Sequence, residues 1–320
     1  MAFADWNNLT SITREKVLPK IVDQISKDQP LLGRLFDNIS LWKGGKTLEQ
    51  PVKYRHNSQG GSYSGLEVLS TSQEQTRTRA QWEVKQLYQP IVLSNIDLAK
   101  NKGEGVADLM ATEMEEAEES LKDKFCTQLF SDGTGNNGKD LTGLIAAIDD
   151  STYVDTYGGI VRSTYTWFKA NYSNANTALT VALMATMFDS CTSGQDSPDL
   201  IVTTKTLFTK YEAVAQTYIR FMAQNGSVNK ADMGIKGLSF RGALVIADEY
   251  CPSGNMWFIN TKYVRLFYMK HPEHPTDKRG FAMTPLRNPV NQDGQVGFIF
   301  WYGQLVNLKP VRSGRMIGLS

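Results

Sequence analysis

Hydrophobic and polar residues recur along this chain with several periods, and the first pattern predicts a short helix in an N-terminal arm. Residues 13–28 carry one apolar face at helical spacing, made of Val17, Ile21, Val22 and Ile25. Pro30 follows, and then a short apolar patch of Leu31, Leu32, Leu35 and Phe36. One short helix cannot bury such a face on itself. We therefore expect residues 1–43 to be an arm that lies on another surface, in the same chain or in another copy.

The next pattern has a period of two and predicts a long β-hairpin within residues 44–90. Residues 46–56 alternate apolar and charged positions, and residues 76–94 do the same. Between them, the segment NSQGGSYSG at 57–65 is rich in Gly and Ser and predicts a mobile tip. An isolated two-stranded hairpin is only marginally stable in water, so this one needs a partner surface.

Residues 104–131 predict one long helix. A single apolar stripe recurs at spacings of three and four, formed by Met110, Met114, Ala117, Leu121, Phe125 and Leu129. The other face is acidic first and basic later, which suits the helix dipole. Residues 91–177, which include this helix, are expected to form a peripheral domain.

From residue 178 the pattern changes to alternating helices and strands. A helix over ALTVALMATMF leads to a buried strand at 200–204, and a second helix is predicted over 207–219. Strands near 239–247 and 256–260 follow, which gives an axial α/β domain at 178–280. Residues 281–320 return to β structure and are expected to close the peripheral domain. The predicted fold class is α+β.

Composition and charge narrow the function. The chain has 320 residues, 41% hydrophobic and 21% charged, which is typical of a globular protein, and its formal net charge is +1. A protein that grips nucleic acid usually carries a basic excess or a basic stripe, and neither is present. Any nucleic acid nearby is therefore expected to be enclosed by this chain without sequence-specific binding.

The cysteines and the termini point to folding in the cytoplasm. Cys126, Cys191 and Cys251 are too widely spaced for a metal-binding pair or a disulfide framework, so we expect buried thiols. The first residues lack the charged and apolar segments of a secretion signal, and no apolar stretch is long enough to span a bilayer.

The motifs that carry chemistry elsewhere have the wrong context here. GTGNNG at 133–138 matches a dinucleotide fingerprint by letter, but it follows a helix where that fingerprint follows a strand. His271 and His274 lie in HPEHP, where the prolines argue against a helical metal site. No GxSxG or GxxxxGK[ST] motif is present. We expect no catalytic residue, no metal site and no cofactor.

Charge suggests how copies of the chain could meet. Among the cations of the hairpin region are Lys53, Arg55, Arg77, Arg79 and Lys85. The predicted long helix carries an acidic run that includes Glu113 and Glu116. A run of this kind is most often a solvated helix face, and a cation site is an alternative. A third interpretation is that the hairpin of one copy crosses the acidic helix of its neighbour.

Several aromatic side chains fall outside the predicted cores: Trp6, Trp42, Tyr63 and Trp82. Aromatic residues are enriched in interfaces. We expect these side chains to become buried only on assembly, with Trp42 and Trp82 among the contact residues.

This order of elements resembles the major capsid proteins of tailed bacteriophages, which have the Hong Kong 97-type shell fold. That family has an N-terminal arm, an extended loop, a spine helix, a peripheral domain and an inserted axial domain. Local stretches are also similar, namely WEVKQLYQPIVLSNIDL at 82–98, LTGLIAAI at 141–148 and DEYCPSGNMWFINTKYVRL at 248–266. The resemblance covers essentially the whole chain.

The resemblance implies a structural subunit that self-assembles, in the host cytoplasm, into hexamers and pentamers of an icosahedral virion head around double-stranded DNA. It also implies a portal and possibly a decoration protein as partners, and no membrane. Many relatives begin with an acidic scaffolding segment, which this sequence lacks, so the resemblance implies a separate scaffolding protein or assembly without one. Lys46 and Lys53 are available for the covalent crosslinking that some relatives use, but nothing in their context assigns them that role.

Three alternatives remain open at this point. The same fold can form a nanocompartment shell around an enzyme cargo. Residues 178–280 could belong to a soluble α/β enzyme, although no convergent polar cluster supports one. A tail or neck component of a phage would form rings or tubes where a capsid protein forms closed shells.

Overall fold

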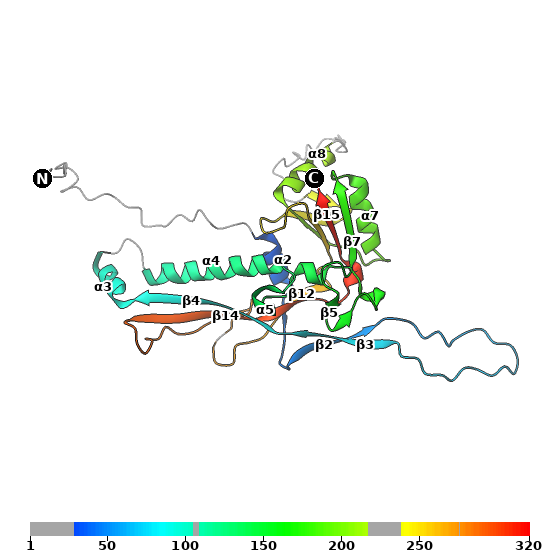
Figure 1. Ribbon diagram of the computed structural model, residues 1–320, viewed down its shortest axis with the longest axis horizontal. Coiled ribbons are helices and arrows are strands. Elements are labelled where there is room, and N and C mark those ends of the chain that lie inside the picture. Colours follow the sequence, from blue (N-terminus) through cyan, green and yellow to red (C-terminus); the bar gives the residue numbers. More distant parts are fainter. Residues whose placement is uncertain (1–28, 105–108, 217–237, 275) are drawn as a thin grey trace, which may run out of the picture.

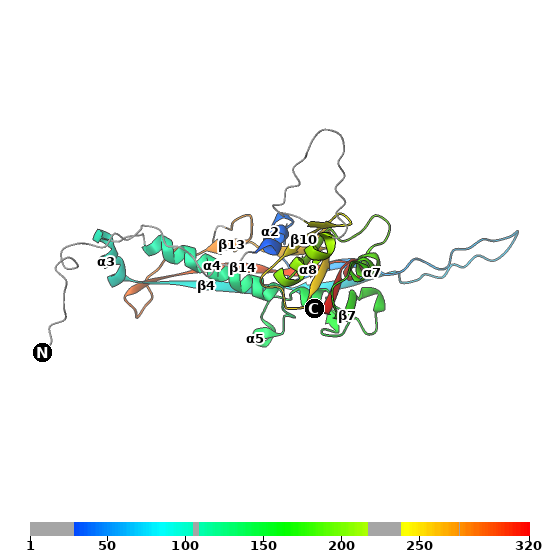
Figure 2. The ribbon, with the colours of Figure 1, turned by 90° about the horizontal axis from the view of Figure 1, so that it is seen from above.

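The computed structural model describes residues 29–104, 109–216, 238–274 and 276–320. The molecule has an elongated body with a compact α/β part at one end, and a hairpin projects past that end (Figures 1 and 2). The predicted helix at 13–28 and Trp6 lie outside the described residues.

The body is built on a five-stranded sheet that joins distant parts of the chain. Its longest strand, β14 (Gly294–Asn307), pairs antiparallel with β4 (Lys85–Ser94), with β12 (Val264–Tyr268) and with β13 (Phe281–Met283). β1 (Ser40–Leu41) pairs parallel with β12. The predicted strands at 296–302 and 305–311 are thus largely one continuous strand, followed by a short 3-10 turn, η2 (Pro310–Arg312).

The long helix α4 (Leu109–Leu129) lies along this sheet, where the sequence predicted a helix at 104–131 (Figure 1). The helix buries the C-terminal half of the predicted apolar stripe, including Leu121, Phe125 and Leu129. The ring of Phe125 meets Trp301 of β14 edge to face, with 4.6 Å between ring centroids. Such aromatic contacts add to the free energy gained by burying the two rings.

Part of the predicted arm packs on its own chain. Helix α2 (Pro30–Asp37) buries Leu31, Leu32 and Leu35 in the same core. The backbone N–H of Leu31 donates a hydrogen bond to the Asp248 carboxylate at 3.3 Å. The sequence left open whether the arm lies on its own chain or on another copy. Residues 30–37 lie on their own chain.

The α/β part contains a six-stranded mixed sheet in the order β7-β15-β11-β8-β10-β9. Its fully buried strands are β8 (Leu200–Thr203) and β11 (Met256–Ile259), and α7 (Val181–Cys191) packs against it. The remaining members are β7 (Asn171–Thr177), β9 (Leu238–Phe240), β10 (Ala243–Ala247) and β15 (Gly314–Leu319), with helix α8 (Lys205–Gln216) alongside β10.

The last strand corrects the prediction that residues 281–320 all close the first sheet. β15 pairs antiparallel with β11 and parallel with β7, so it belongs to the α/β part. Its residues Met316 and Leu319 are buried in the core of that part. The closing strands therefore tie both sheets together.

The hairpin consists of β2 (Thr47–Lys53) and β3 (Arg77–Glu83), paired from Thr47 opposite Glu83 to Lys53 opposite Arg77. The predicted single run at 76–94 divides at Val84, because β3 pairs with β2 whereas β4 pairs with β14. The smaller elements are α3 (Asn95–Glu104), α5 (Gly135–Gly138), α6 (Leu144–Ala147), β5 (Thr156–Tyr157), β6 (Ile160–Val161) and η1 (Thr166–Phe168). The α+β class that the sequence predicts is confirmed.

The contact between α4 and the sheet should dominate subunit stability. Phe125→Ala removes a fully buried ring, and such truncations cost about 3–5 kcal/mol. Urea unfolding of the unassembled subunit measures this loss. Glu116→Ala, on the exposed side of the same helix, should change stability by less than about 0.5 kcal/mol. Equal effects from both variants would contradict the packing described.

Candidate assembly interface

The hairpin beyond β2 and β3 is held by polar contacts. Glu74 accepts hydrogen bonds from the Ser58 backbone N–H (2.9 Å), the Ser58 hydroxyl (2.6 Å) and the Gln59 side-chain amide (2.8 Å). Tyr54 donates its hydroxyl proton to the carbonyl of Gln75 at 2.5 Å. The bonds from Ser58 and Gln59 lower the pKa of Glu74 to about 2, and the Ser58 hydroxyl contributes most. The bonds from Ser58 and Gln59 to Glu74, which we call the Glu74 clip, therefore join the two sides of the hairpin without an apolar core.

The tip exposes apolar side chains that nothing in the described chain covers. They are Tyr63, Leu66, Val68 and Leu69, and Leu66 and Val68 are fully exposed. We call these four residues the tip cluster. Contiguous exposed apolar side chains of this kind mark interaction sites.

The base of the hairpin is fixed by Trp82. Its ring packs edge to face against Tyr157, with 5.9 Å between centroids. Gly158 has φ of 57°, and a Cβ there would lie 3.0 Å from the Trp82 ring. Glycine at this position meets both needs, a left-handed backbone and a close approach.

Trp42 and Trp82 differ from the expectation that they become buried only on assembly. Trp42 is 5% exposed and Trp82 is 4% exposed within the single chain, so neither waits for assembly to become buried. Trp42 donates its indole N–H to the carbonyl of Gly44 at 2.9 Å, and its backbone N–H to Tyr268 at 2.7 Å. Their packing partners lie far away in the sequence. Tyr63, by contrast, is exposed.

Most of the predicted hairpin cations already have partners in their own chain. Arg79 forms an ion pair with Glu49 at 3.0 Å, and Arg55 donates to the carbonyl of Gln75 at 2.9 Å. Lys85 donates to the carbonyl of Gly138. Nζ of Lys53 lies 3.3 Å from Nδ1 of His56. Arg77 is exposed at the end of β3.

The acidic face of α4 lies away from the sheet. Glu116 is exposed and Glu113 is half-buried. Glu118 pairs with Lys122 at 2.8 Å along the helix. In the described chain, Lys53, Arg55, Arg79 and Lys85 have partners other than the acidic face of α4, so one copy does not bring the two predicted charge sets together.

The sequence did not predict one surface, which is the face of the five-stranded sheet opposite α4. Pro90 pairs with Phe298, and Tyr88 pairs with Phe300. The side chains that alternate away from α4 on β4 and β14 carry no charge: Gln86, Tyr88, Pro90, Val92, Val296, Phe298, Phe300 and Tyr302. A signal was present, because GFIFWYG at 297–303 is apolar at successive positions, which is typical of a strand covered on both faces.

The comparisons with known proteins decide the family. The family model described as SU10 major capsid protein matches residues 64–286, more than half of the chain. The chain belongs to this family of major capsid proteins. None of the curated proteins matches its sequence.

Solved structures agree on the fold. A capsid chain of cyanophage A-1(L) has a TM-score of 0.75 at 16% identity, covering 97% of this chain and 98% of that one. A native GTA particle capsid has 0.64 at 9%, covering 98% and 100%. An SrpI encapsulin of Synechococcus elongatus has 0.61 at 9%, covering 100% and 97%. The phage capsid fold is confirmed, and the chain is a structural subunit of a capsid shell.

For this capsid protein, the motifs with possible chemistry have structural roles. In GTGNNG, Asn136 and Asn137 have left-handed backbone angles, φ 49° and 56°, within a tight turn. Nδ1 of His271 accepts hydrogen bonds from the backbone N–H groups of Glu273 (3.1 Å) and His274 (3.2 Å). That nitrogen is therefore unavailable to a metal, and burial lowers the His271 pKa.

The cysteines and the possible metal ligands are the other groups that the sequence raised. All three cysteines are buried free thiols, and burial raises the pKa of Cys191 and Cys251 to about 12. Across the described ranges, no three His, Cys, Asp or Glu side chains converge where a metal ion could bind. None of the helices in these ranges is long and apolar enough to cross a bilayer.

The Glu74 clip should make the order of the hairpin depend on pH. A carboxylate whose pKa is lowered on folding stabilises the folded form above its ordinary value of 4.5, and this contribution is lost as the pH falls to about 2. Amide hydrogen exchange at Ser58, whose N–H donates to Glu74, should therefore accelerate across that range after correction for intrinsic exchange. Glu74→Gln should exchange rapidly and without this pH dependence, whereas β2 stays protected. A Ser58 amide equally protected at pH 6 and pH 3 would contradict the clip.

Proposed function

We propose that this chain assembles in the host cytoplasm into hexamers and pentamers of an icosahedral phage head that encloses double-stranded DNA. Family membership makes it a shell subunit; the symmetry, the contents and the place of assembly are the proposal. The observation that carries it is the projecting hairpin, whose apolar tip cluster is not covered by any of the described residues.

Two features make the hairpin suited to a closed shell. Its base is fixed by Trp82 and by the stacking of Tyr54 on Trp167, and the part beyond these contacts is held by polar bonds such as those of Glu74. A shell of hexamers and pentamers repeats one heterologous contact at slightly different angles. A hairpin with a fixed base and a compliant end can make that contact at each angle.

The partners follow from the same proposal. The net charge of +1 and the acidic face of α4 fit a container for DNA better than a protein that binds its bases. A separate scaffolding protein and a portal, and possibly a decoration protein, complete the set that we propose.

The contact between hairpin cations and the acidic α4 of another copy remains part of the proposal. Arg77 and Arg79 are exposed on β3, and Glu113 and Glu116 lie on the outer side of α4. Exposed ion pairs contribute about 0–1 kcal/mol each. Such pairs would set the docking register more than the binding energy.

A nanocompartment shell is the second candidate, favoured by the SrpI encapsulin structure, whose fold covers 100% of this chain. Both candidates predict closed particles and differ in what the particles hold.

Electron microscopy of the expressed protein, with its scaffolding partner where one is needed, tests the shell. We expect closed particles with five-fold vertices. Particles from infected cells should contain nuclease-protected DNA, and a packaged enzyme in place of DNA would establish the nanocompartment. Rings or tubes would indicate a tail or neck component, and a persistent monomer would reject assembly.

Charge reversal tests the cross-copy ion pairs. Arg77→Glu with Arg79→Glu should reduce the yield of particles and lower the free energy of unfolding by about 1 kcal/mol at most, because both side chains are exposed and Arg79 loses only its surface pair with Glu49. Lys139→Glu with Lys278→Glu, a matched reversal at two exposed cations outside the hairpin, should assemble normally. Normal particles from the hairpin variant would remove this contact from the proposal.

A further inference from the structure

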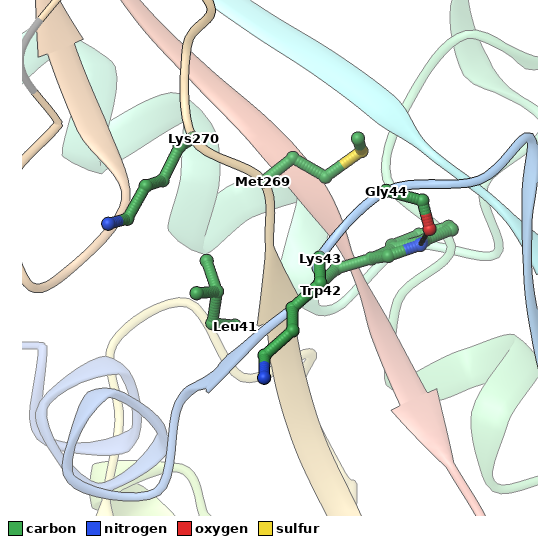
Figure 3. Close-up of a pocket in the computed structure, with 6 residues that line it drawn as sticks. All are labelled: Leu41, Trp42, Lys43, Gly44, Met269 and Lys270. Atoms are coloured by element: carbon green, nitrogen blue, oxygen red, sulfur yellow. Dashed lines mark hydrogen bonds between the residues drawn. The ribbon is translucent and has the colours of Figure 1, made fainter.

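A pocket of about 310 Å³ lies beside the base of the hairpin, where the chain leaves β1 and where β12 ends (Figure 3). Its wall is formed by two short segments that are far apart in the sequence, Leu41–Gly44 and Met269–Lys270. The parallel pairing of Leu41 with Tyr268 brings these segments together. The size is at the lower end of the range for binding pockets in proteins.

The pocket combines an apolar wall with positive charge. Leu41, Trp42 and Met269 supply apolar surface, and Lys43 and Lys270 extend to the same side (Figure 3). Both lysines are exposed, and no ion pair within the described residues involves either of them. A segment with aliphatic side chains and one carboxylate is complementary to this arrangement.

The hairpin tip has that chemistry. Leu66 and Val68 are fully exposed, and Glu67 lies between them. Glu67 is also the only charged residue from 57 to 73. The tip cannot reach the pocket of its own chain, because tip and pocket lie at opposite ends of β2 and β3 (Figure 1).

We propose that Leu66, Glu67 and Val68 of one copy occupy this pocket in another copy, with Glu67 beside Lys43 and Lys270. Each copy then offers one tip and one pocket, which is a heterologous contact that propagates from copy to copy. The proposal rests on the proposed shell function and names the site that receives the tip. The strands of the hairpin and its tip can contact different neighbours.

A charge swap tests the pairing. Glu67→Lys alone, and Lys43→Glu with Lys270→Glu, should each raise the protein concentration needed for assembly by roughly tenfold or more, equivalent to about 1.4 kcal/mol. Combining all three substitutions should restore assembly toward that of the wild type. All three residues are exposed, so monomer folding should be unchanged, as circular dichroism and thermal unfolding would verify.

A cysteine pair tests the proximity directly. Glu67→Cys with Lys43→Cys should form disulfides between copies when assembled particles are oxidised, giving a ladder of multimers on a non-reducing gel. Glu67→Cys with Glu118→Cys is the matched control, because Glu118 is exposed on α4, away from the pocket. The three native cysteines are buried and should not contribute.

The outcomes separate this site from the shell itself. If the wild type forms closed particles but the charge swap does not rescue and no ladder forms, the pocket proposal is wrong and the shell stands. If pocket variants fail while Glu67→Lys assembles normally, another segment occupies the pocket and the proposal is again wrong. If the wild type forms no particles under any condition, the shell proposal fails first.

Discussion

The strand β14 is the element on which the rest of the body depends. Over its 14 residues it pairs with β4, β12 and β13, and it carries Trp301 into the contact with Phe125. The backbone groups of β4 along this edge gain their partners from β14, and Phe125 of α4 gains its ring contact from the same strand. Pairings between distant segments are slow to form. The pairing of β4 with β14 joins such segments and is therefore expected to form late in folding.

Close approach at one glycine lets β14 serve both partners. At Gly303 the pairing passes from β4 to β12, and a Cβ there would lie 2.1 Å from the carbonyl oxygen of Phe267 and 2.6 Å from the Trp301 ring. A side chain at this position would push the strands apart. Gly303 therefore joins β4, which continues from the hairpin strand β3, to β12 of the body.

The sequence predicted the elements whose patterns are local and missed those set by distant partners. The α4 stripe and the hairpin follow from periods of 3.6 and two, which depend on neighbouring residues alone. The division at Val84 was missed because the buried positions change there from even-numbered residues in β3 to odd-numbered residues in β4, and this change follows from pairing with different strands. Burial of Trp42 and Trp82 was missed for the same reason, since their partners include Tyr268 and Tyr157. The pocket joins residues 41–44 to residues 269–270, and no spacing in the sequence indicates that contact.

The distribution of charge over the surface suggests why assembly can be directional. The outer side of α4 is acidic, so two copies meeting there repel each other. The opposite face of the sheet carries an uncharged stripe, and the tip cluster is apolar, so contacts on these surfaces gain free energy by removing apolar area from water. The Glu74 clip joins the two sides of the hairpin between its strands and its tip. This restraint lowers the conformational entropy that the hairpin loses on docking, while the tip beyond it stays able to adapt. A restrained hairpin, one attractive face and one repulsive face together favour a single mode of association over random aggregation.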